Sequence, residues 1–128
     1  MQSGYIAFLD VLGFREIVES KLKEEEQGKF GSSSAFFDRY LGTITEALDT
    51  GSGGLEPVDL IVFSDCILLV TDGGGEPALQ SLLIRCSRIS GLLLQKGIAV
   101  RGAIHCGPML RKSMSAGVFA AGPAIIQA

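Results

Sequence analysis

The sequence predicts an α+β domain in which helices cover one face of an antiparallel sheet. Apolar runs rich in β-branched and aromatic residues indicate strands. They lie at 4–10, 58–64, 66–71 and 98–106. Apolar residues at helical spacing indicate helices between them. These lie at 14–26, at 34–49 and from Glu76 to about Gln95. The order is therefore β-α-α-β-β-α-β, the ferredoxin-like or palm arrangement, with the first strand and the central hairpin side by side.

The first half of the chain supports this order element by element. The run at 4–10 is short and stops at Asp and Gly. In 14–26, apolar residues recur every three or four positions with charged residues between them. The Gly- and Ser-rich stretch 28–33 breaks the pattern before the second helix at 34–49. The glycines of 51–54 then end that helix.

The second half opens with a hairpin. Strands 58–64 and 66–71 flank Ser64 and Asp65, which we expect at the hairpin tip. Pro77 lies in the first turn of the third helix, a position that tolerates a residue without a backbone N–H.

After the strand at 98–106, the dipeptide Gly107-Pro108 predicts a turn. The remaining residues are rich in Gly and Ala. From Gly122 the sequence has the character of a helix start, so the chain ends where a last helix begins.

Composition narrows the class of protein. The 128 residues are enough for one domain, 1–128, with a real core. The net charge of −3 argues against binding a nucleic-acid backbone. Cysteines 66, 86 and 106 are an odd count without metal-site spacing and predict reduced thiols. Neither a signal peptide nor a membrane span is indicated, so we expect a cytoplasmic protein.

Two aspartates stand out because each interrupts an apolar run. Asp10 follows Phe8-Leu9, and Asp65 follows Phe63-Ser64. A buried carboxylate without a partner costs several kcal/mol, so a shared divalent cation is a natural partner. The alternative is that each residue caps a turn or a helix.

Four motifs in order resemble the class III nucleotide cyclases over nearly the whole chain. They are Phe8-x-Asp10-x-x-Gly13-Phe14, Ser64-Asp65, Arg101-Gly102-x-Ile104-x-x-Gly107 and Gly122-Pro123-Ala124. Their wording, Phe-Leu-Asp-x-Leu-Gly-Phe, Phe-Ser-Asp and Arg-Gly-Ala-Ile, is most similar to the Pycsar pyrimidine cyclases of bacterial antiphage defence.

The resemblance implies a two-metal site. Asp10 and Asp65 would bridge two Mn²⁺ or Mg²⁺ ions, and the Val11 carbonyl would add a ligand. One ion lowers the pKa of the attacking ribose hydroxyl and the other neutralises the triphosphate. His105 is read as structural, and zinc is not expected because no His or Cys partner stands at ligand spacing.

Other residues are expected to contact substrate. Gly13 allows close backbone approach, and the N–H groups near Phe14 suit the β- and γ-phosphates at a helix start. Arg101 is a candidate catalytic and substrate contact, although an arginine on a strand is as often a surface residue. Tyr40 is a candidate substrate contact, and the alternative is that its ring is part of the hydrophobic core.

The base-reading positions of the purine cyclases correspond here to Ile61 and Phe119. Neither can hydrogen-bond a purine edge, which favours UTP or CTP as substrate. The family's Asn aligns with Ile126, and its transition-state Arg would fall beyond Ala128. Either the chain is truncated or this branch uses another group.

The resemblance also implies a head-to-tail homodimer with composite active sites, with Met109–Phe119 as an arm toward the partner. A separate effector would read the cyclic product. One alternative is a purine or diguanylate-type palm cyclase, although a diguanylate-type enzyme predicts Gly-Gly-acidic-acidic where this chain has Phe63-Ser64-Asp65-Cys66. The other is a catalytically degenerate palm module for regulation or dimerisation.

Overall fold

The structure, a computed structural model, describes residues 2–49, 55–114 and 117–121, with side chains described as far as Gly107. Its elements are β1 (Gln2–Val11), α1 (Phe14–Glu26), α2 (Ser32–Asp49), β2 (Val58–Phe63), β3 (Cys66–Thr71), α3 (Glu76–Gln95), β4 (Val100–Met114) and β5 (Gly117–Ala121). The strand order is β2-β3-β1-β4-β5, and every neighbouring pair is antiparallel. The predicted α+β palm arrangement is confirmed.

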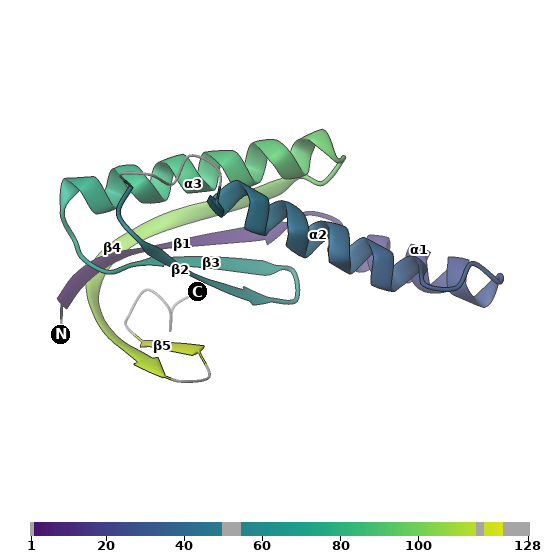
Figure 1. Cartoon of the computed structure of the whole chain (residues 1–128), viewed down its shortest axis with the longest axis horizontal. Helices are drawn as coiled ribbons and strands as arrows, with labels where there is room; N and C mark the ends of the chain where they lie inside the picture. The colour runs from purple at the N-terminus through teal and green to yellow at the C-terminus, as the bar shows by residue number, and fades with distance from the viewer. Residues whose placement is uncertain (1, 50–54, 115–116, 122–128) are drawn as a thin grey trace.

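The core lies between the sheet and the helices α2 and α3, which cover the same face (Figure 1). Alternate residues of β1 and β3 point into it, and the helices supply large apolar side chains from the other side. The fully buried members include Ala7, Ile44, Ile67, Leu69, Leu82, Ile89 and Leu93. This period-2 burial fixes the register of the strands, because a one-residue slip would turn the apolar set outward.

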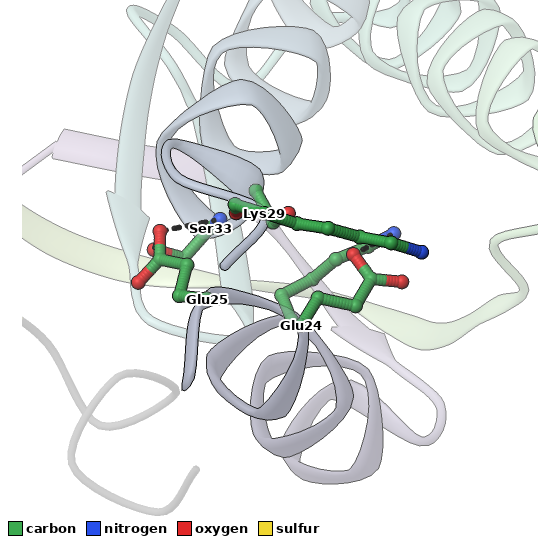
Figure 2. A network of polar contacts seen from close by, with 6 residues as sticks. Glu24, Glu25, Lys29 and Ser33 are labelled. Carbon is green, nitrogen blue, oxygen red and sulfur yellow. Dashed lines mark hydrogen bonds and ion pairs between the residues drawn. The ribbon is translucent and has the colours of Figure 1, made fainter. Parts of the chain in front are cut away.

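Helix α1 behaves differently. Within the described chain it buries none of its residues, and with the start of α2 it extends past the end of the sheet (Figure 1). The turn between the two helices is tied by a carboxylate. The Ser33 N–H and hydroxyl donate to Glu25 Oε1 at 3.0 and 2.7 Å (Figure 2), which lowers the pKa of Glu25. The glutamate thus satisfies a backbone donor in the first turn of α2.

A buried arginine joins α3 to the entry of β2. Arg85 is 7% exposed, and its guanidinium donates to the Glu56 carbonyl and to the Ser81 hydroxyl. Ser81 also donates to the Glu56 carbonyl. These bonds satisfy polar groups that would otherwise be costly to bury.

The end of the chain corrects one sequence expectation. No turn forms at Gly107-Pro108, because β4 continues to Met114 and pairs Pro108 with Ser3 near the start of β1. The segment Met109–Phe119, expected as an arm toward a partner, contributes the end of β4 and the start of β5, which pair as a hairpin below the sheet in the view of Figure 1. Its contact with a partner stays a prediction. The helix expected from Gly122 lies outside the described residues.

In the described part of the chain, none of the helices combines the length and the apolarity needed to cross a membrane. Cys66, Cys86 and Cys106 are all free thiols, as the sequence predicted.

Candidate functional site

The register of the sheet brings three chemically active side chains together. Asp10 of β1 lies opposite Cys66 of β3 on one side and opposite Arg101 of β4 on the other. Cross-strand partners point to the same face of a sheet. Because the neighbours Leu9 and Val11 point into the core, Asp10 points away from the helices, and it is exposed.

Asp65 joins this group through the tip of the β2–β3 hairpin. Ser64 adopts a left-handed conformation there, with φ 55°. The Val11 N–H donates to the Asp65 carbonyl at 2.9 Å, so the tip is bonded to the residue that follows Asp10. The two aspartates, predicted at neighbouring strand ends, are therefore near one another, because a backbone hydrogen bond joins Asp65 to Val11, the residue after Asp10.

The thiol of Cys66 is affected by the charges of both aspartates. Burial raises the pKa of Cys66, and the charge of Asp10, a hydrogen bond with Asp10 and the charge of Asp65 raise it further. One thiol therefore lies in the field of both carboxylates. Sequence reasoning missed Cys66 as a member of the site; its position directly after Asp65 was the available signal.

The donor set fits a hard divalent cation. Among the described residues, no ion pair joins Asp10 or Asp65 to a cationic side chain. The same residues contain no cluster of three or more His, Cys, Asp or Glu side chains with metal-site geometry. An ion here would therefore take two carboxylates, a backbone oxygen such as that of Val11, and water or substrate oxygens, which Mg²⁺ accepts readily.

The carboxylates open onto two different hollows. Asp10 lines a pocket of about 310 Å³ with Phe8, Arg101 and His105. Asp65 lines another of about 300 Å³ with Phe14 and Ser64. A ligand that used both carboxylates would therefore lie across the strand ends rather than within one cavity.

Gly13 and Phe14 form the start of α1. Gly13 has φ 69°, a conformation that favours glycine, and its carbonyl accepts the first helical bond from Ile17 at 3.1 Å. No side chain caps this terminus in the described structure. Its first backbone N–H groups are thus available to an anion, although Glu16 in the first turn already places negative charge there.

Arg101 and His105 lie on the open face near Asp10. Arg101 is exposed and has no ion pair within the described residues. The His105 ring meets Phe8 edge-on, with centroids 5.5 Å apart. The roles predicted for Asp10, Asp65, Arg101 and the loop to Phe14 stay predictions, but these groups do converge on one end of the sheet.

Tyr40 lies on the other side of the sheet, in the core. It is 2% exposed, and its hydroxyl has no hydrogen-bond partner among the described groups. Burial, and then the charges of Asp65 and Cys66, raise the pKa of Tyr40 to about 12. Its predicted contact with substrate stays a prediction, and the ring lies on the helix side of the sheet rather than on the open face.

The structure describes only some of the positions that correspond to the base-reading residues of the purine cyclases. Ile61 lies on β2 opposite Leu68 and is half-buried. Phe119 lies on β5 opposite Lys112, with its side chain outside the described set. Ile126 lies outside the described residues.

No protein-family model matches the chain, and no curated protein matches it in sequence. Several solved structures are similar in fold, two adenylyl cyclases among them. The adenylyl cyclase CyaB from P. aeruginosa is 14% identical with a TM-score of 0.61, over 98% of this chain and 68% of that one. A bacterial light-regulated adenylyl cyclase is 15% identical with a TM-score of 0.62, over 96% and 65%. The fold is thus the palm fold of the class III cyclases, and this chain spans about two thirds of each neighbour.

Proposed function

We propose that this domain is a nucleotide cyclase that converts UTP or CTP to the 3′,5′-cyclic nucleotide and pyrophosphate. The observation that carries the proposal is the pair Asp10 and Asp65. Both lie at one end of the sheet, within the field of the same thiol and without a cationic partner among the described residues, on a fold shared with adenylyl cyclases.

Each residue of the site has a part in that reaction. Asp10, Asp65 and the Val11 carbonyl would hold two Mn²⁺ or Mg²⁺ ions. Such ions, when bound, lower the pKa of the ribose 3′-hydroxyl and neutralise the triphosphate. The N–H groups at the start of α1 bind β- and γ-phosphate oxygens, and Gly13 keeps that approach open. Arg101, directly opposite Asp10, adds positive charge toward the leaving pyrophosphate.

Base choice follows from Ile61 and Phe119. A site built to read a purine edge needs hydrogen-bonding side chains, and a missing partner costs a large factor in discrimination. Ile61 and Phe119 offer none, which supports a pyrimidine substrate. ATP is the second candidate, because both structural neighbours are adenylyl cyclases.

The proposal extends to the setting of the enzyme. The exposed open face supports a homodimer in which each active site takes residues from both chains. Following the resemblance to the Pycsar cyclases, the domain would act in the bacterial cytoplasm in antiphage defence, and a separate effector protein would read its product.

The test is to incubate the protein with each of the four NTPs and Mn²⁺ and to identify products by mass spectrometry. We expect cUMP or cCMP well above cAMP and cGMP, and no product from Asp65→Asn. A comparable rate on ATP would overturn the pyrimidine assignment and favour a purine cyclase. No cyclic product from any NTP would favour the degenerate palm module.

A further inference from the structure

A pocket of about 400 Å³ lies apart from Asp10 and Asp65. Three elements form it. Helix α1 contributes Ile17 and Lys21, α2 contributes Phe36, Arg39 and Tyr40, and the turn between α3 and β4 contributes Lys96, Gly97 and Ile98. Its volume is within the usual range of small-molecule sites.

The charged residues of this pocket all have the same sign. Lys21, Arg39 and Lys96 line it, and no described carboxylate does. Lys21 pairs with Glu24 at 3.5 Å. Arg39 and Lys96 have no ion pair with any described residue, so two cationic groups remain to meet an anion.

The floor of the pocket is aromatic. Phe36 and Tyr40 are 6% and 2% exposed, and their rings are stacked with centroids 6.0 Å apart and an interplanar angle of 6°. The Tyr40 hydroxyl is a buried donor without a partner in the described structure. The charges of Asp65 and Cys66 act on this hydroxyl, so it lies toward the hairpin tip and Tyr40 lines the pocket with its ring rather than with its hydroxyl.

The wall formed by the α3–β4 turn is fixed in advance. Gly97 has φ 79°, and the N–H groups of Lys96, Gly97 and Ile98 bond the last carbonyls of α3 at 2.9 to 3.0 Å. This pattern is a glycine-based helix C-cap. This wall is therefore ordered before a ligand binds, so binding loses little conformational entropy there.

We propose that this pocket binds a small anion that carries a flat ring, such as an aryl phosphate, with Arg39 and Lys96 on the anion and Phe36 and Tyr40 under the ring. The Tyr40 ring also touches Phe14, the first residue of α1, with centroids 5.7 Å apart. Tyr40 thus connects the pocket to the start of α1, which follows the strand that carries Asp10. A bound anion therefore alters cyclase turnover, a consequence that rests on the proposed function.

Binding is tested without turnover, by calorimetry and backbone NMR shifts with phenyl phosphate as the probe. We expect saturable binding at least about tenfold tighter than that of inorganic phosphate or of phenol, since each lacks one half of the recognised group. Shifts should concentrate on α2 and the α3–β4 turn. Equal affinity for inorganic phosphate would overturn the role of the ring, and an absence of saturable binding would overturn the site.

The variant pair isolates the charges. Arg39→Met/Lys96→Met should weaken phenyl phosphate binding about tenfold or more. Lys23→Met/Lys29→Met, which changes two exposed lysines outside the pocket by the same charge, should leave it unchanged. An equal loss of phenyl phosphate affinity in both double variants would indicate a general effect of charge and would overturn the proposed roles of Arg39 and Lys96. The effect of phenyl phosphate on cyclic-nucleotide formation is measured separately, so a protein that proves not to be a cyclase still decides the binding claim.

Discussion

Along β1, residues that face the helices alternate with residues that face away, and the two sets differ in kind. Ala7, Leu9 and Val11 are buried in the core at 0%, 7% and 4% exposure. Phe8 is half-buried and Asp10 is exposed on the opposite face. The helix face therefore holds the fold by packing at every position, whereas the opposite face is buried at Ile6, which is 1% exposed, and is open only toward Asp10. We therefore expect changes on the helix face to lower stability and changes around Asp10 on the open face to lower activity.

The largest contrast concerns the aspartates. Asp10→Asn and Asp65→Asn should each lower cyclase turnover by about 100-fold or more, the magnitude for losing one preorganised charge-stabilising group. The free energy of unfolding should change little, because both carboxylates are exposed and have no cationic partner among the described residues. Turnover and urea denaturation are measured on the same samples. Near-normal turnover with Mn²⁺ in either variant would break the functional half of the comparison.

Two adjacent leucines on β3 test the packing half. Leu69 is 0% exposed against the helices, whereas Leu68 is half-buried on the other face. Leu69→Ala should lower the free energy of unfolding by about 3 kcal/mol or more, because it removes apolar contacts and leaves a cavity. Leu68→Ala should cost about 1 kcal/mol, since less of its surface is buried. Equal losses by urea denaturation would mean that the two faces are packed alike.

Two glycines of β4 sharpen the same contrast on the backbone. A Cβ at Gly102 would lie 1.9 Å from the Phe8 carbonyl oxygen and 2.8 Å from Leu9 Cδ2. Gly102→Ala should therefore destabilise the β1–β4 pairing by about 2 kcal/mol or more. At Gly107 a Cβ meets no described atom within 4 Å, so Gly107→Ala is the matched control. Thermal unfolding of both variants is the measurement, and a neutral Gly102→Ala would contradict the close approach of the two strands.

The smallest effect is a pH dependence from Tyr40. Its pKa in the folded state is about 12, above the ordinary value near 10. The stability due to this neutral phenol is fully present below pH 10 and is lost as the pH rises from about 10 to about 12, on the order of 2 kcal/mol in total. Tyr40→Phe should reduce that alkaline loss and leave stability at pH 7 unchanged or higher, because an unpaired hydroxyl is removed. Stability measured at intervals from pH 7 to pH 11 checks this. An unchanged alkaline loss in the variant would assign the effect to other groups.

The sequence predicted the fold where local pattern carried the information. The short apolar run before Asp10 and the helical spacing of 14–26 both correspond to elements of the structure. The continuation of β4 through Gly107-Pro108 could not be read locally, because it depends on pairing with Gln2 to Gly4, more than a hundred residues away. Turn chemistry was overridden by a distant partner strand.

The site divides in the same way. Asp10 and Asp65 stood out because charge is unusual in apolar strands, but their link through Cys66 needed the register of β1 and β3. The pocket of Arg39 and Lys96 left no signal in the sequence. Its cations are widely separated along the chain, and only the packing of α2 against the α3–β4 turn brings them to one cavity.

Mn²⁺ binding tests most directly the claim that the open-face carboxylates are kept for a divalent cation. Calorimetric titration with Mn²⁺, alone and with a non-hydrolysable UTP analogue, would compare the wild type with Asp10→Asn/Asp65→Asn. The exchange Asp38→Asn, an exposed carboxylate on α2, serves as the matched control. The account predicts binding by the wild type and the control, strengthened by the analogue, and none by the double variant. Equal Mn²⁺ binding by all three proteins would contradict it.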